Sequence, residues 1–82
     1  MKENEITSNE FWAIVMECNR IDVTETPNTS SNWDWHRIES YILNLEKTGS
    51  KELRYFKSPF ESPFTEIEVQ FKGKRMFLFK IS

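Results

Sequence analysis

Cysteine, glycine and alanine are scarce in this 82-residue chain, which has one Cys, two Gly and a single Ala. The only thiol, Cys18, cannot form an internal disulfide, and such a chain is typical of a reducing compartment. Gly49 and Gly73 stand apart, so the clustered glycines of a phosphate-binding loop are missing. One His and one Cys are too few for a structural zinc site. We therefore expect no cofactor and no metal.

Long apolar runs are also absent. No stretch approaches the roughly 20 apolar residues that a membrane-spanning helix needs. The first five residues, Met-Lys-Glu-Asn-Glu, are polar and lack the apolar segment of a secretory signal. These features predict a cytoplasmic protein without a membrane partner.

Aromatic side chains are what the sequence has in abundance, with seven Phe, three Trp and two Tyr. Aromatic residues bury the most area per side chain, so even a short chain can form one compact core from them. We expect a single small domain over residues 1–82, with residues 1–6 disordered. Scarce Ala and Gly with ample Lys, Asn, Ile and Glu are typical of an AT-rich bacterial or phage genome.

Charge is distributed unevenly along the chain, although the net charge is only −2. Residues 1–46 contain nine acidic and three basic side chains, whereas residues 47–82 contain four acidic and eight basic ones. An asymmetry of this kind affects how a charged partner is steered toward the protein rather than which fold forms.

A helix and a loop are predicted after the N-terminal residues. Thr7 and Glu10 have the spacing of a capping box, and apolar residues then recur at helical intervals, which predicts a helix over residues 8–20. Residues 22–32 are rich in Ser, Thr and Asn and contain Pro27, so we expect a mobile loop there.

A second helix is predicted to begin after a cap at Ser31 or Asn32 and to end near Lys47, before Gly49. Apolar residues again recur at helical spacing, namely Trp35, Ile38, Tyr41, Ile42 and Leu45.

Strands are predicted in the last third, where the apolar period changes from 3.6 to two. A short strand over residues 51–56 is followed by two Ser-Pro-Phe segments, which cannot lie in a central strand. Residues 66–72 and 75–81 form the next two strands, joined by a turn at Lys72, Gly73 and Lys74.

The register of that last hairpin depends on the length of its turn. A two-residue turn places Met76 and Leu78 beside the core side chains of the preceding strand, and a three-residue turn places Phe77 and Phe79 there. We favour the second register because it brings the bulkier pair to the core. In either register, one face of the last strand presents large apolar side chains to something other than the first core.

The predicted fold class is therefore α+β, in the order α-α-β-β-β. Two helices pack on one face of a three-stranded antiparallel sheet.

Candidate catalytic residues are few. Cys18 and His36 could form a nucleophilic pair if the helices pack antiparallel, but Cys18 belongs to an apolar stripe, where a free cysteine is usually a core residue. Glu66 and Glu68 share one face of a strand, where acidic residues are usually solvated. The sequence therefore predicts a protein that is not an enzyme.

The first functional hypothesis is a non-enzymatic binding protein of the toxin-immunity or phage-inhibitor type. An acidic surface suits a basic protein partner, such as the groove of a nucleic-acid enzyme. Trp33 and Phe60 are candidate aromatic contacts. The complete set of candidate partner-binding residues is Glu17, Asp22, Glu25, Trp33, Asp34, Glu39 and Phe60.

Two alternatives come from other functional classes. A nucleic-acid-binding module would use the basic hairpin residues Lys72, Lys74 and Arg75, although a pI near 5.4 makes nucleic acid the less favoured partner. A structural or oligomeric component would bury the second apolar face of the last strand between subunits. The oligomeric states that we consider are a monomer and a homodimer.

Overall fold

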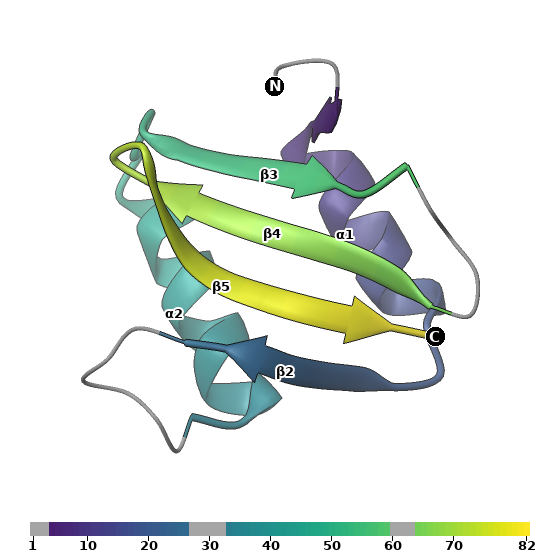
Figure 1. The fold of residues 1–82 in the computed structure, drawn as a ribbon. Coiled ribbons are helices and arrows are strands. Elements are labelled where there is room, and N and C mark those ends of the chain that lie inside the picture. The colour runs from purple at the N-terminus through teal and green to yellow at the C-terminus, as the bar shows by residue number, and fades with distance from the viewer. Residues whose placement is uncertain (1–3, 27–32, 60–63) are drawn as a thin grey trace.

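The computed structural model describes residues 4–26, 33–59 and 64–82, which form two helices and one five-stranded sheet (Figure 1). In chain order the elements are β1 (Glu5–Ile6), α1 (Ser8–Glu17), β2 (Ile21–Glu25), α2 (Trp35–Lys47), β3 (Leu53–Lys57), β4 (Thr65–Phe71) and β5 (Lys74–Ile81). The strands are antiparallel throughout and lie in the order β1-β3-β4-β5-β2.

The three-stranded sheet in the order α-α-β-β-β was therefore wrong, because it omitted both edge strands. β1 lies within residues 1–6, where we expected disorder, and it pairs with β3. β2 includes residues 22–25, the first four residues of the expected loop over residues 22–32, and it pairs with β5. In each case a neighbouring strand supplies the hydrogen bonds that a short segment cannot make alone. Residues 1–3 and 27–32 lie outside the described residues.

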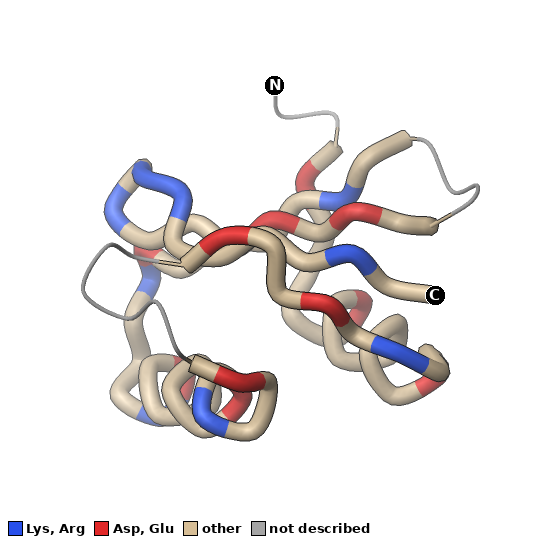
Figure 2. Tube along the Cα trace, turned by 60° about the horizontal axis from the view of Figure 1, so that its bottom comes forward, with Lys and Arg blue, Asp and Glu red and all other residues tan. Residues whose placement is uncertain are grey.

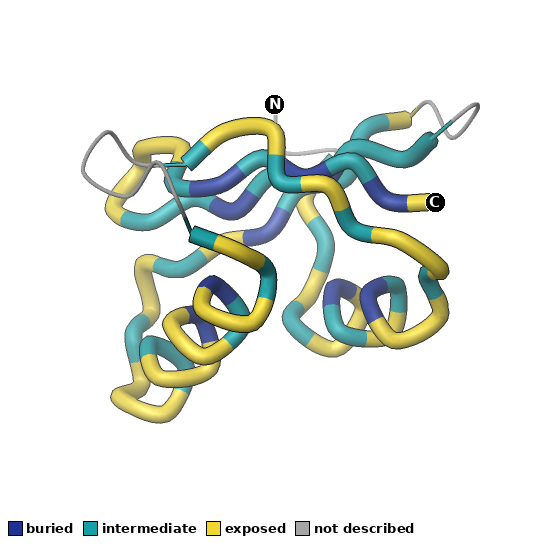
Figure 3. Tube along the Cα trace, turned by 90° about the horizontal axis from the view of Figure 1, so that it is seen from below, coloured by how far each residue is buried: buried dark blue, intermediate teal, exposed yellow. Residues whose placement is uncertain are grey.

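Both helices lie on the same face of the sheet, as Figure 3 shows along the sheet edge. α1 carries the chain from β1 at one edge to β2 at the other, and α2 returns it to β3. The opposite face has no layer over it in the described part of the chain (Figure 1). The topology thus leaves one broad sheet face and one five-residue edge strand, β2, toward solvent.

The helix ends differ from the sequence prediction. The capping box is confirmed, since the Thr7 side chain accepts a bond from Glu10 N and the Glu10 side chain accepts one from Thr7 N. α1 ends at Glu17 rather than at residue 20, because the chain turns extended at Cys18 and then enters β2. Asp34, not Ser31 or Asn32, is the N-cap of α2, with its Oδ1 accepting from Arg37 N at 2.9 Å.

The core consists of large side chains between the helices and the sheet. The Phe11 ring of α1 is fully buried and stacks on Tyr55 of β3, with ring centroids 4.4 Å apart. Ile38 and Ile42 are the buried residues of α2. The sheet contributes Tyr55, Ile67, Val69, Phe77, Phe79 and Ile81. Burying an aromatic or branched side chain of this size contributes about 1.5–3 kcal/mol, so these few residues account for most of the hydrophobic stabilisation.

The β4–β5 hairpin has the favoured register but reaches it in another way. Phe77 lies opposite Val69 and Phe79 opposite Ile67. The turn itself has two residues, Lys72 and Gly73, and a β-bulge between residues 75 and 77 of β5 then shifts the pairing by one residue. The bulge therefore brings the two phenylalanines to the core, whereas the sequence analysis predicted that a three-residue turn would do so.

The hairpin turn predicts a stabilising substitution. Lys72 and Gly73 have φ angles of 56° and 79°, as a type I′ turn requires, and lysine is costly in this left-handed region. We expect Lys72→Asn to raise the free energy of unfolding by about 0.5–1 kcal/mol, because asparagine tolerates positive φ. Urea denaturation measures the change. Lys74→Asn, at a strand position, is the matched control and should give no gain, and equal effects of the two substitutions would contradict the explanation.

Candidate functional site

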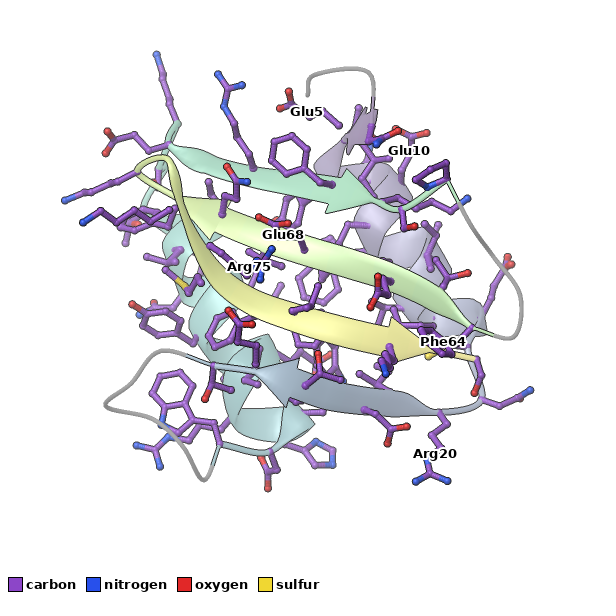
Figure 4. All side chains as sticks on the ribbon, viewed as in Figure 1. Glu5, Glu10, Arg20, Phe64, Glu68 and Arg75 are labelled. Carbon is purple, nitrogen blue, oxygen red and sulfur yellow. The ribbon has the colours of Figure 1, made fainter. Side chains whose placement is uncertain are left out.

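The open face of the sheet forms a broad hollow of about 730 Å³ over β3, β4 and β5. Its lining includes two apolar side chains, Phe56 and Leu78, among charged ones. Glu68 and Arg75 lie side by side in the middle of this face (Figure 4) and form an ion pair with an N–O distance of 3.5 Å. Of the apolar residues expected on the second face of β5, Leu78 lines this hollow, whereas Met76 packs partly buried against the core.

Both arginines that line the open face are paired with carboxylates of the protein. Arg75 also binds Glu25 of β2 at 3.2 Å, and Arg54 binds Glu5 of β1 at 3.3 Å. The hydrogen bond to Glu25 is the first cause of the raised Arg75 pKa, and the negative charge of Glu68 is the second. Exposed pairs of this kind contribute little to stability. They do reduce the net charge that the hollow could offer to a ligand, so we do not place the functional site there.

The acidic residues singled out from the sequence lie on one side of the molecule. Figure 2 shows acidic residues along β2, at the end of α1 and at the start of α2, with the β2 side brought forward. We call this surface the acidic edge. It consists of Glu17, the last residue of α1, Asp22 and Glu25 of β2, Asp34, the N-cap of α2, and Glu39 in α2.

Two members of the acidic edge have further roles in the fold. Asp34 caps α2, and Glu25 holds Arg75. Asp22 pairs with Arg20 at 3.0 Å, but both side chains are more than half exposed, so this pair is readily exchanged for another cation. Glu17 is exposed at the end of its helix.

Trp33 is a packing residue as well as a surface one. Its ring contacts Tyr41 and Phe77 at centroid distances of 5.2 and 5.9 Å, and the Arg37 guanidinium lies 4.8 Å over it. It therefore covers the end of the core and remains only partly exposed. Phe60, the other aromatic candidate, lies outside the described residues.

The basic candidates are only partly brought together. Lys72 and Lys74 flank the tip of the β4–β5 hairpin, and the Lys72 backbone N–H donates to the Glu52 carbonyl, which places Lys51 nearby. Arg75 lies on the open face between Glu25 and Glu68 instead. The structure thus gives three exposed lysines at one corner, with the acidic side chain of Glu52 among them.

The suggested Cys–His pair does not have the features of a nucleophile. The Cys18 thiol donates a hydrogen bond to the Val15 carbonyl at 3.0 Å, and burial raises its pKa. A thiol with a raised pKa is a poor nucleophile at neutral pH. His36 is exposed on α2, and no hydrogen bond joins it to Cys18 in the described residues.

Glu66 and Glu68 also lack the arrangement of a carboxylate pair for hydrolysis. Glu68 Oε2 accepts from the Gln70 side-chain amide at 2.7 Å and also binds Arg75, so the Glu68 carboxylate is held by these two side chains.

Glu46, which the sequence analysis did not single out, accepts hydrogen bonds from three side chains. Its carboxylate accepts hydrogen bonds from Ser8 Oγ at 2.7 Å, from Trp12 Nε1 at 3.1 Å and from the Tyr55 hydroxyl. The donors belong to α1 and β3, and Glu46 belongs to α2. No hydropathy pattern could have identified it, because an acidic residue near the end of a helix normally faces solvent.

Burial and hydrogen bonding act in opposite directions on Glu46. Burial by itself raises the pKa, but the bonds from Tyr55, Ser8 and Trp12 together outweigh it, so the Glu46 pKa is lower than usual. Burial and the bond to Glu46 raise the pKa of Tyr55. Glu46 is thus a hydrogen-bonded carboxylate that joins α1, α2 and β3.

Within residues 4–26, 33–59 and 64–82, no three His, Cys, Asp or Glu side chains come together to hold a metal ion. No helix in the described residues is long and apolar enough to cross a membrane. Comparison of the chain with known protein families, with curated proteins and with solved structures gave no match.

The Glu46 hydrogen bonds predict a pH-dependent stability. A carboxylate with a lowered pKa in the folded state stabilises the fold at pH values above its ordinary pKa of 4.5, and this contribution is lost as the pH falls through the folded-state value. We expect Glu46→Gln to lower the free energy of unfolding by about 1–2 kcal/mol at pH 7 and to flatten its fall below about pH 4.5. Urea denaturation at a series of pH values measures both effects.

Glu39→Gln is the matched control, since Glu39 lies on the same helix but is absent from this hydrogen-bond network. It should leave the acid-side slope close to that of the unaltered protein. If Glu46→Gln also keeps the original slope, Glu46 is not the group responsible.

Proposed function

We propose that this chain is a non-enzymatic binding protein that neutralises a basic macromolecular partner through the acidic edge. The observation that supports this proposal is the gathering of Glu17, Asp22 and Glu39 with their neighbours on one side, although they come from three separate elements (Figure 2). A partner with a positively charged groove would be attracted over distances of about one Debye length, ~10 Å at 0.1 M salt.

The distribution of the lysines strengthens the electrostatic side of the proposal. Lys51, Lys72 and Lys74 lie at the corner where β3 begins and the β4–β5 hairpin turns. β3, β4 and β5 all lie on one side of β2 in the sheet order. The protein is therefore dipolar, and a basic partner is turned toward the β2 side as it approaches.

Nucleic acid is the second candidate, and the lysine corner is the observation that favours it. Its support is weaker, because Arg75 is held by two carboxylates and Glu52 lies among the lysines. Assembly with further copies of the chain is a third. Its support is the exposure of Met16, Tyr41 and Leu43, which are 84%, 37% and 45% exposed.

The test compares two charge-reversed variants that change the net charge equally. Glu17→Lys with Glu39→Lys alters the acidic edge, whereas Glu52→Lys with Glu66→Lys alters residues away from it. Tagged protein is used to capture partners from a lysate of the cells that encode it, at about 50 and 300 mM salt. We expect one stoichiometric protein whose recovery falls at least about tenfold with the edge variant and much less with the control.

The other outcomes are equally informative. Equal losses with both variants would show that only net charge matters, and full recovery with the edge variant would refute the acidic edge as the binding surface. Nuclease-sensitive recovery that Lys72→Glu with Lys74→Glu abolishes would instead establish nucleic-acid binding.

A further inference from the structure

The backbone of β2 offers unpaired hydrogen-bonding groups at the sheet edge. Arg20 and Ser82 exchange both of their backbone bonds, N to O at 3.1 Å and 3.0 Å. The same register continues with Ile21 opposite Ile81, Asp22 opposite Lys80 and Val23 opposite Phe79. Hydrogen-bonded and non-hydrogen-bonded pairs alternate in an antiparallel ladder. Asp22 therefore bonds to β5, and the N–H and C=O groups of Ile21 and Val23 point away from the sheet.

These outward groups are available to a partner. No further hydrogen bond reaches the backbone of Ile21 or Val23 from the residues that the structure describes. Figure 3 looks onto this edge, with β2 at the front of the sheet and the two helices below the sheet in the view. β1, at the opposite edge, has only two residues, so β2 is the longer of the two edge strands. An unpaired strand edge is a template for a further strand.

Side-chain chemistry decides which strand could be added. Ile21 and Val23 point toward the helix-covered face, where they pack partly buried against the core. Asp22, between them, points to the open face and is exposed, and Glu25 holds Arg75 there. Neighbouring residues of paired strands lie on the same face, so an added strand would need apolar side chains beside Ile21 and Val23 and basic ones beside Asp22 and Glu25.

A second copy of this chain does not meet that requirement. If two β2 strands paired about a twofold axis at Asp22, this residue would face Asp22 of the other copy, and Glu25 would gain no basic neighbour. Like charges opposite each other on paired strands are destabilising. The acidic side chains therefore act against self-pairing, and they favour a different chain with basic residues.

We propose that β2 binds its partner by strand addition, taking up an extended segment in which apolar and basic residues alternate. This inference rests on the proposed function, because the basic partner is the one that the acidic edge attracts. It adds that the Ile21 and Val23 backbone groups supply hydrogen bonds, while Asp22 and Glu25 select the charge of the incoming segment.

A defined probe tests the proposal without knowledge of the natural partner. The probe is a capped heptapeptide of alternating lysine and valine, and its counterpart with glutamate for lysine is the charge control. In the free protein, amide hydrogen exchange should be fast for Ile21 and Val23 and slow for Asp22. Saturating probe should slow exchange at Ile21 and Val23 at least about fivefold, whereas the glutamate peptide should have no effect.

Two variants separate backbone pairing from side-chain packing. Val23→Pro removes the outward N–H without breaking a bond to β5, since proline is tolerated where an edge N–H faces solvent. Val23→Ala is its reference, because it shortens the same side chain but keeps the N–H. We expect Val23→Pro to bind the probe at least about tenfold more weakly than Val23→Ala, with similar circular dichroism spectra for the two.

Every other outcome would refute strand addition, and one of these outcomes would still be consistent with the proposed function. Equal affinities of the two Val23 variants, or no binding at about 1 mM probe, would refute it. If Glu17→Lys with Glu39→Lys weakens binding of the probe while exchange at Ile21 and Val23 stays fast, the acidic edge binds basic partners by its side chains alone. Dimers in sedimentation that Val23→Pro disperses would show that a second copy occupies the edge.

Discussion

The Glu46 carboxylate is the interaction on which the arrangement of the layers depends. It extends from α2 and accepts hydrogen bonds from Ser8 and Trp12 of α1 and from Tyr55 of β3. Hydrophobic packing alone is non-directional, so buried aromatic rings can accept several rotations of a helix on a sheet. A carboxylate that must satisfy three donors accepts far fewer, because any displaced donor would be left unpaired near the core. Glu46 therefore restricts the orientation of the helices on the sheet, which apolar packing alone would leave less well defined.

The two helices connect strands at different positions of the sheet, and these connections separate in space the acidic and basic residues that are separated in the sequence. α1 begins at the β1 edge and ends at the β2 edge, and α2 begins at the β2 side and ends before β3. The acidic residues of the first half thus lie at the end of one helix, along β2 and at the start of the other. The lysines of the second half lie in the β4–β5 turn and before β3. A simple helical hairpin packed on three strands would not bring Glu17, Asp22 and Glu39 to one sheet edge, so the edge strand that the sequence analysis missed is the element that creates the acidic edge.

Prediction from the sequence was reliable where one local pattern determined the structure. The capping box at Thr7, the apolar stripe of α2 and the alternation in β4 and β5 each have a local cause, and each element is present. β2 was missed although Ile21, Val23 and Thr24 are β-branched, because the polar residues and Pro27 that follow outweighed this short signal. β1 has only two residues and depends entirely on β3. Glu46 could not be identified, since its donors come from residues 8, 12 and 55 and meet only in the folded chain. The favoured hairpin register was correct because it was chosen to bring Phe77 and Phe79 to the core. The bulge that produces this register depends on tertiary packing.

The charges on β2 have two physical explanations, and they are compatible. Edge strands commonly carry charged side chains that prevent aggregation, and Asp22 and Glu25 would serve that purpose in any soluble protein. Protection alone, however, does not require one sign of charge, and lysine is the residue most often used for it. Here every charged side chain within β2 is acidic, and the neighbouring helix ends add Glu17, Asp34 and Glu39. A single sign repels copies of the same chain and attracts chains of the opposite sign, so it discriminates between partners as well as protecting the edge. The unpaired backbone of Ile21 and Val23 then gives a chain that the charges have selected a place to bind.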